Sequence, residues 1–226
     1  MPDITSNVRE FETHPDEAAS SAAEAIVAQS PLAFSLHEQR ALPFAAHPGV
    51  VLREEAMLGH LVLRGGAIVL DEAVREVLGI ALPARPHALV FDESGTRSIQ
   101  WLSPDEWLII VPGGEEFGVE HRLRHALGEA HFSVVNTSGG QTVLSLEGAR
   151  AREVLMKSVS YDVHPAAFPV GKGVSTVFAK TAVILRRPDE TRWEMVVRRS
   201  FADYCYRWLL DAAAEYDVTV LRQAPL

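Results

Sequence analysis

The stretch SIQWLSPDEWLIIV, residues 98–111, decides the fold that this sequence predicts. Ile99 and Trp101 fall on one side of an extended segment, because strand side chains alternate with a period of two. Residues 103–106 supply turn chemistry, since proline presets φ at the second turn position and serine and aspartate bond nearby backbone groups. The unbroken apolar run 107–111 is typical of a strand covered on both faces. We therefore predict a β-hairpin whose second strand is central in its sheet.

The composition of the 226-residue chain is that of an ordinary globular protein. No apolar run reaches the roughly 18 residues that a membrane span needs. The single cysteine, Cys205, excludes an intrachain disulfide and a thiolate metal cluster. The acidic N-terminal region lacks the basic-then-apolar pattern of a signal peptide, so a cytoplasmic location is expected. The net charge of −9 argues against nucleic-acid binding.

Charge is unevenly distributed along the chain. Residues 1–30 carry one arginine against six acidic residues, a net charge of −5. Residues 165–200 carry seven basic residues against three acidic ones, a net charge of +4. The basic residues are Lys172, Lys180, Arg186, Arg187, Arg192, Arg198 and Arg199. This basic zone indicates either an anionic ligand or acidic partner, or a solvated strand face that carries arginines.

We expect an N-terminal arm, partly disordered, at residues 1–30, then two α+β subdomains at 31–130 and 131–226 whose boundaries are approximate and which can interleave. Further predicted strands cover 50–52, 58–63, 88–91, 132–135, 142–146, 174–178, 182–186, 193–197 and 218–220. Helices are predicted at 71–78, 118–130, 148–158 and from residue 200 onward. The fold class is therefore α+β, with two small mixed α/β-sandwich-like subdomains and largely antiparallel sheets.

The predicted helix ends follow from local chemistry. Asp71 and Glu72 suit the positive N-terminal end of the first helix, and Gly79 is a natural stop. In the last helix Ser200 is the expected cap, with Asp203 at the capping-box position. Its apolar stripe comprises Phe201, Cys205, Trp208, Leu209, Ala212, Ala213 and Tyr216.

A metal site is one interpretation of the histidines in the 118–130 helix. His121 and His125 lie four residues apart, and Glu129 lies one turn further on. That spacing places ligands on one helix face. The alternative, which the neighbouring arginines favour, is a pair of solvent-facing histidines.

Other patterns give no catalytic motif. The stretch 171–176 lacks the glycine and serine positions of a phosphate loop, and 137–140 is no nucleophile elbow. Asp105 and Glu106 are adjacent and form a poor acid–base pair. A loop-fastening role is expected for Asp162 and His164, and inert core for Cys205. On motifs alone the chain lacks a catalytic centre of its own.

Four blocks of sequence together resemble the gamma subunit family of heterotetrameric sarcosine oxidases. In order they are Ser30-Pro31-Leu32, Leu78-Gly79 with Leu82-Pro83, the block 101–108 (WLSPDEWL), and 198–204 (RRSFADY). The resemblance extends from about Ser30 to Leu221, and WLSPDEWL is its most specific part.

The resemblance implies a role in a complex of alpha, beta, gamma and delta subunits. Such complexes oxidise the N-methyl group of sarcosine or a related amine, giving glycine, hydrogen peroxide and 5,10-methylenetetrahydrofolate. FAD, FMN and NAD are implied for the alpha and beta subunits and zinc for delta, with tetrahydrofolate also outside this chain. The gamma subunit is similar to the folate-binding part of the aminomethyltransferases and is implied to be a non-catalytic companion that docks on alpha.

The carboxylates that aminomethyltransferases use have no convincing counterpart in this chain. Asn136 stands where the gamma family often has aspartate, and 199–203 lacks the Gly-Glu of the transferase motif. An amide cannot replace a carboxylate that must polarise a reacting nitrogen. We therefore assign no catalytic, cofactor-binding or metal residue. The alternative function is a free-standing tetrahydrofolate-binding one-carbon transferase that uses the zone from Arg186 to Arg199, where substitution of Arg187 or Arg199 should weaken binding.

Overall fold

Two sheets form the protein in the computed structural model, which describes residues 28–38 and 48–221. The six-stranded sheet has the order β11-β1-β7-β10-β9-β8 and the five-stranded sheet the order β3-β4-β5-β2-β6. Every strand pair is antiparallel except β1 with β11, which confirms the α+β class. The strands are β1 (Val50–Glu55), β2 (Gly59–Gly65), β3 (Leu89–Phe91), β4 (Ser98–Ser103), β5 (Glu106–Val111), β6 (Phe132–Asn136), β7 (Gln141–Glu147), β8 (Lys172–Phe178), β9 (Thr181–Arg187), β10 (Arg192–Arg198) and β11 (Val218–Leu221).

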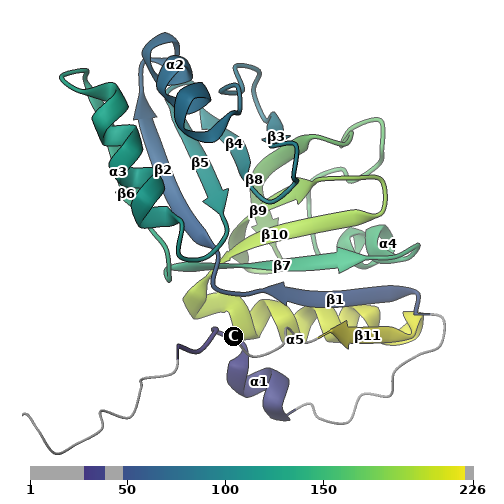
Figure 1. Cartoon of the computed structure of the whole chain (residues 1–226). Coiled ribbons are helices and arrows are strands. Elements are labelled where there is room, and N and C mark those ends of the chain that lie inside the picture. Colours follow the sequence, from purple (N-terminus) through teal and green to yellow (C-terminus); the bar gives the residue numbers. More distant parts are fainter. Residues whose placement is uncertain (1–27, 39–47, 222–226) are drawn as a thin grey trace, which may run out of the picture.

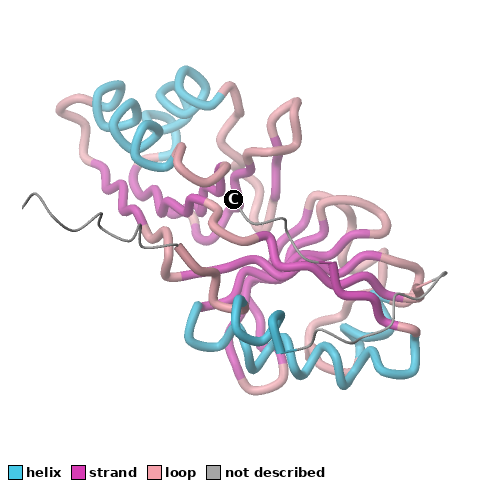
Figure 2. The backbone as a smooth tube through the Cα atoms, turned by 60° about the horizontal axis from the view of Figure 1, so that its bottom comes forward, coloured by secondary structure: helices cyan, strands magenta, loops and turns pink. Residues whose placement is uncertain are grey.

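The helices lie on the outer sides of the sheets. They are α1 (Ala33–Glu38), α2 (Ala67–Leu78), α3 (Glu116–Leu127), α4 (Ala151–Met156) and α5 (Ala202–Ala213). Figure 1 shows α2 and α3 against the five-stranded sheet and α5 below the six-stranded sheet. In Figure 2 the strands lie between two groups of helices. None of the described helices is long and apolar enough to cross a membrane.

The predicted hairpin is confirmed. Strands β4 and β5 pair in antiparallel register with Trp101 opposite Trp107, and β5 is the central strand of its sheet. Trp107 is 1% exposed, and its indole Nε1 donates a 2.9 Å hydrogen bond to the Pro83 carbonyl. Burying such a ring contributes about 2–3 kcal/mol. The hairpin therefore supplies the centre of the core beneath α2 and α3.

The core of the six-stranded sheet packs against α4 and α5. The predicted stripe is confirmed for Cys205, Leu209 and the alanines at 212 and 213, all buried. Phe201 and Trp208 lie at its margin, 42% and 39% exposed. The amphipathic helix predicted to contact a sheet is therefore confirmed, with the flank of its apolar stripe facing solvent.

Two predicted helix starts are wrong. Helix α2 begins at Ala67, so Asp71 lies in its second turn and binds Arg75 and the Leu82 amide instead of the helix end. Ser200 makes no capping bond, because a 3₁₀ turn at Arg199–Phe201 precedes α5. Gly79 ends α2 in the left-handed region, at φ 71°, as predicted.

The chain crosses between the sheets, so consecutive halves do not form them. Strand β1 lies in the six-stranded sheet with the C-terminal strands, and β6 lies in the five-stranded sheet. Neither strand therefore follows a division at residue 130. Between the sheets lies a small apolar cluster of Leu108, Ile110, Val143 and Val196. The expected N-terminal arm falls outside the described residues except for positions 28–30.

Candidate functional site

A buried polar cluster, here called the central joint, links the two sheets. His60, Ser98 and Gln100 come from the five-stranded sheet, and Arg186 and Glu194 from the six-stranded sheet. All five are buried, with exposed fractions of 6% or lower. Polar groups that are removed from water need hydrogen-bond partners, so the contacts of these five side chains show how the centre of the fold is held together.

Arg186 holds the joint together. Its Nη2 donates to Ser98 Oγ at 2.9 Å and lies 3.0 Å from Glu194 Oε2. Burial lowers the pKa of Arg186, and the Glu194 carboxylate opposes that change. The alternative of a solvated strand face is therefore wrong here, because Arg186 is 2% exposed.

His60 and Gln100 close the joint from the other sheet. The Leu58 carbonyl accepts from His60 Nδ1 at 3.0 Å, and burial lowers the pKa of His60 to about 4. Gln100 Nε2 donates to the Gly173 carbonyl at 3.1 Å. A Cβ at Gly173 would lie 1.9 Å from Gln100 Oε1, so glycine permits this approach. These side chains occupy the centre of the fold, and the imidazole is neutral at neutral pH. Four of their buried atoms have no hydrogen-bond partner among the described residues: His60 Nε2, Gln100 Oε1, and Nε and Nη1 of Arg186.

Arg187 is also internal. Its Nη1 donates to the Phe168 carbonyl at 2.7 Å, its Nη2 lies 2.9 Å from Glu190 Oε2, and its guanidinium stacks 5.3 Å from the Trp193 ring centre. At 4% exposure it is not a solvated residue, and none of its charge is directed at a ligand site.

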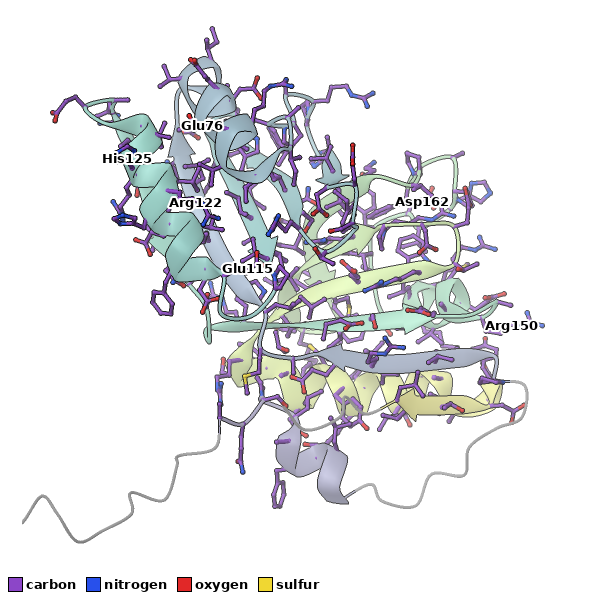
Figure 3. The ribbon with its side chains drawn as sticks, viewed as in Figure 1. Glu76, Glu115, Arg122, His125, Arg150 and Asp162 are labelled. Atoms are coloured by element: carbon purple, nitrogen blue, oxygen red, sulfur yellow. The ribbon has the colours of Figure 1, made fainter. Side chains whose placement is uncertain are left out.

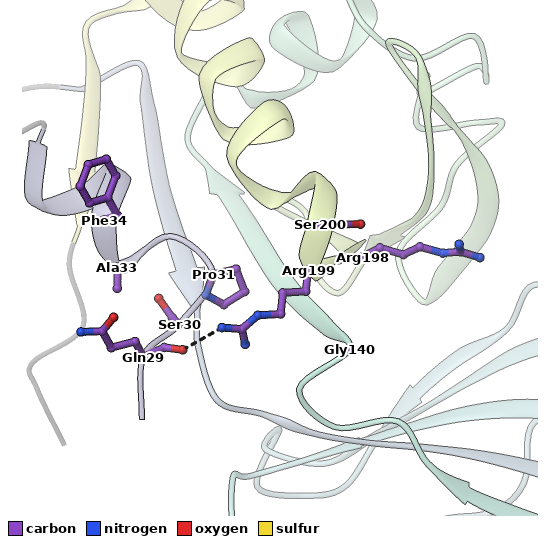
Figure 4. Close-up of a pocket in the computed structure, with 9 residues that line it drawn as sticks. All are labelled: Gln29, Ser30, Pro31, Ala33, Phe34, Gly140, Arg198, Arg199 and Ser200. Atoms are coloured by element: carbon purple, nitrogen blue, oxygen red, sulfur yellow. Dashed lines mark hydrogen bonds between the residues drawn. The ribbon is translucent and has the colours of Figure 1, made fainter. Parts of the chain in front are cut away.

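A surface pocket lies at the start of α5. It is lined by Gln29, Ser30, Pro31, Ala33, Phe34, Gly140, Arg198, Arg199 and Ser200. Figure 4 shows the Arg199 side chain reaching toward Gln29, while Arg198 extends to the other side of the β10 end. Arg199 Nη2 donates to the Gln29 carbonyl at 3.4 Å, a long contact. Arg198 and Arg199 are both exposed, with Arg199 directed toward the pocket and Arg198 away from it.

The two histidines of α3 lie on its exposed surface. His121 and His125 are exposed on α3, and Glu129 lies in the turn after the helix. Figure 3 shows His125 and Arg122 on α3 with Glu76 nearby on α2. No group of three histidine, cysteine or acidic side chains with metal-binding geometry occurs in the described ranges.

The remaining candidates have structural roles. Asp162 Oδ1 accepts from the His164 amide at 2.9 Å, which confirms loop fastening. Asp105 binds Ser103 and Arg64, not Glu106. Burial raises the pKa of Cys205 to about 12, consistent with an inert thiol.

The loop from β6 to β7 uses its polar residues to cross between the sheets. Asn136 Oδ1 accepts from the Ser138 amide at 3.0 Å. Ser138 Oγ accepts from the His60 amide at 2.9 Å, and the Thr137 amide donates to the His60 carbonyl at 2.8 Å. Asn136 and the 137–140 turn therefore fasten the chain where it crosses between the sheets.

Sequence reasoning missed His60, Gln100 and the pairing of Arg186 with Glu194. One signal for the ion pair was present: a tight turn at 188–191 places Glu194 opposite Arg186 in the β9–β10 register. The interior location of His60 and Gln100 had no local signal, because each is an isolated polar residue in a strand and its burial depends on the other sheet.

Solved structures place this fold. Its likeness to the glycine cleavage system aminomethyltransferase T from Bartonella henselae has a TM-score of 0.65 at 14% identity and covers 86% of this chain and 59% of that one. A chain of the heterotetrameric sarcosine oxidase from Corynebacterium sp. U-96, in complex with pyrrole 2-carboxylate, matches with a TM-score of 0.76 at 32% identity, covering 86% of this chain and 98% of that one. The chain therefore has the fold that aminomethyltransferase T and a chain of this sarcosine oxidase share.

Sequence comparison identifies the family. Residues 65–215 match the profile of the sarcosine oxidase, gamma subunit family. The sarcosine oxidase subunit gamma of Corynebacterium sp. strain U-96 is 34% identical over 189 residues, 83% of this chain and 91% of that protein. That of strain P-1 is 37% identical over 172 residues, 74% and 81% of the two chains. The chain belongs to the sarcosine oxidase gamma subunit family, as its sequence motifs predicted.

Proposed function

We propose that this chain is the gamma subunit of a heterotetrameric sarcosine oxidase and acts as a structural subunit without catalytic residues. The observation that carries the proposal is the 32% identity over 98% of a chain from such a complex, with a TM-score of 0.76. The proposed complex demethylates sarcosine or a related N-methyl amine to glycine, hydrogen peroxide and 5,10-methylenetetrahydrofolate. FAD, FMN, NAD and zinc are proposed to lie in the alpha, beta and delta subunits.

The packing of the centre supports a structural role. Arg186 and Gln100 bond across the two sheets, to Ser98 Oγ and to the Gly173 carbonyl, and Glu194 pairs with Arg186 within the six-stranded sheet. Asn136, the residue in place of a family carboxylate, is used in a turn. A rigid two-sheet body of this kind suits docking, here proposed on the folate-binding part of alpha, because a preorganised surface loses little entropy on association.

Co-expression with the alpha, beta and delta subunits tests the proposal. We expect the purified chain alone to be colourless and inactive, and to form a stable complex when the three subunits are present. Spectra from 350 to 500 nm and peroxide formation from sarcosine, measured on the chain and on the complex, provide the readouts. Flavin absorbance retained by the pure chain, or no association with the other subunits, contradicts the proposal.

A second candidate function has one observation in its favour. Among residues 28–38 and 48–221 the Arg199 side chain makes one long hydrogen bond, to the Gln29 carbonyl, and it lines a surface pocket where a folate carboxylate could bind. Arg187, the other residue expected for that role, is occupied internally. Calorimetric titration with tetrahydrofolate, repeated on Arg199→Ala, decides it: measurable affinity lost in the variant supports a one-carbon transferase, and a null titration removes it.

A further inference from the structure

The pocket at the start of α5 has a charge that nothing in its wall balances. Among its nine lining residues two are arginines and none is acidic, although the whole chain has a net charge of −9. Arg198 and Arg199 are both exposed, and no carboxylate of the described chain lies within 4.0 Å of either. By contrast, the other arginines from β9 to α5, at 186, 187, 192 and 207, each form an ion pair.

The backbone that carries these arginines is fixed by contacts from several elements. Arg198 pairs with Gln141 in the β10–β7 register. The Arg199 amide donates to the Gly140 carbonyl at 2.9 Å. On the opposite wall, Ser30 Oγ donates to Glu54 Oε2 at 2.6 Å, and Ser35 of α1 binds Asp203 of α5. The pocket is thus preformed, so an incoming group need not order its walls.

An aromatic ring completes the surface. Phe34 is 71% exposed on α1, and Pro31 and Ala33 lie beside it in the pocket wall. Arginine and aromatic side chains are the residues most enriched at the energetic centres of protein interfaces. A guanidinium also binds a carboxylate through two parallel hydrogen bonds, which gives direction as well as attraction.

We propose that this pocket is the docking site for an acidic segment of the adjacent oxidase subunit, with a carboxylate on Arg199 and an apolar side chain against Phe34. Arg198 contributes attraction from the far side of the β10 end. The inference rests on the proposed function, because it needs the partner subunit. It adds the surface and the chemistry of the contact, neither of which follows from family membership.

The test uses the co-expressed complex with single substitutions in this chain. Arg199→Ala and Phe34→Ala should each weaken the association of this subunit about tenfold, measured by mass photometry over a dilution series. Arg198→Ala should weaken it less, because its side chain leaves the pocket. The matched control is Arg122→Ala on α3, an exposed arginine that also forms no ion pair within the described residues and should leave the dissociation constant unchanged. Thermal unfolding of each isolated variant verifies folding.

The salt dependence of the dissociation constant distinguishes the electrostatic contribution of Arg199 from the apolar contribution of Phe34. The wild-type dissociation constant should rise from 50 to 300 mM salt, and Arg199→Ala should flatten that dependence whereas Phe34→Ala should retain it. Equal dissociation constants for Arg199→Ala and Arg122→Ala overturn the inference. Deletion of residues 1–27 from the Arg199→Ala variant gives a second test. If this deletion restores wild-type affinity, the inference is overturned, because Arg199 then acts by binding the acidic segment of its own chain and not the partner subunit.

Two further outcomes keep the inference distinct from the proposed function. If the wild-type chain fails to associate with the other subunits, the proposed function fails first. If the wild-type complex forms and all pocket variants bind equally well, only the docking site is wrong. Loss of tetrahydrofolate affinity in Arg199→Ala with unchanged subunit association assigns the pocket to a small molecule and overturns the docking site.

Discussion

Two pairs of consecutive arginines end neighbouring strands and have opposite surroundings. Arg186 and Arg187, at the end of β9, are 2% and 4% exposed and are bound to carboxylates and carbonyls. Arg198 and Arg199, at the end of β10, face solvent without an ion pair in the described chain. Strands β9 and β10 are adjacent in the sheet. The basic zone of the sequence therefore contains one buried arginine pair and one exposed arginine pair in the structure.

The difference follows from what covers each strand end. The second sheet covers Arg186, and Phe168 and Trp193 surround Arg187, so both arginines need buried partners. At Arg198 the chain leaves the sheet for α5, and no sheet packs over that end. An exposed arginine pair without an ion pair in the described part of the chain is available for an external partner, whereas a buried pair serves stability.

The largest loss of stability should come from a substitution in the apolar core, which contributes more to the free energy of unfolding than either arginine pair. Trp107→Ala should lower the free energy of unfolding by about 3–5 kcal/mol, because it removes a buried ring and leaves a cavity. Urea denaturation followed by circular dichroism measures the change. Trp208→Ala, at a residue that is 39% exposed, is the control and should cost less than half as much. Equal losses would show that the hairpin is not the centre of the core.

The next effect tests the buried pair directly. Arg186→Ala should cost roughly 3 kcal/mol, because it leaves Glu194 buried and also removes the bond to Ser98. Arg192, 2.8 Å from Glu194, keeps the loss from being larger. Arg198→Ala should change stability by no more than about 0.5 kcal/mol. Chemical denaturation of both variants provides the comparison, and similar losses would remove the distinction between the pairs.

Local sequence patterns could predict the elements but not their partners. The hairpin was predicted correctly because the apolar run 107–111 is buried throughout, as expected for a strand covered on both faces. Burial does not alternate along 98–103, because Ser98 and Gln100 are buried against the other sheet. The exchange of β1 and β6 between the sheets depends on pairing across long sequence separations, as in Val51 with Glu147. No local periodicity carries that information.

The candidate site was predictable only where it was exposed. Arg198 and Arg199 were recognised as part of a basic zone, and their exposure agrees with the usual location of arginine. Arg186 and Arg187 were misjudged because that same preference predicts exposure, whereas a second sheet overrides it. His60 and Gln100 were missed for the same reason, since their burial is decided by residues far away in the sequence.

The pH dependence of stability tests the burial of His60, which lies in the central joint with Arg186. The pKa of His60 is about 4 in the folded protein, mainly because of burial, and about 6.5 when unfolded. Between these values the unfolded state binds one more proton, so stability is complete above pH 6.5 and falls as the pH falls toward 4. The expected loss is about 2 kcal/mol at pH 5.

Substitution of the imidazole identifies the source of that loss. Denaturant midpoints of wild type and His60→Gln between pH 7 and 5 should differ in slope, with the variant showing the shallower decline. His121→Gln, at an exposed residue of α3, should follow the wild type. A wild-type slope that His60→Gln retains would place the titrating group elsewhere.

The smallest effect separates charge from hydrogen-bond geometry. Arg187→Lys keeps the positive charge but loses the fork that reaches both the Phe168 carbonyl and Glu190, so it should cost about 1–2 kcal/mol. Arg199→Lys should lower the free energy of unfolding by no more than a few tenths of a kcal/mol, because the hydrogen bond of Arg199 to the Gln29 carbonyl is long. Denaturation midpoints at pH 7 measure both. If lysine lowers stability equally little at 187 and 199, the positive charge of Arg187 is sufficient for its contacts. The two strand ends would then differ in burial alone, and not in directed hydrogen bonds.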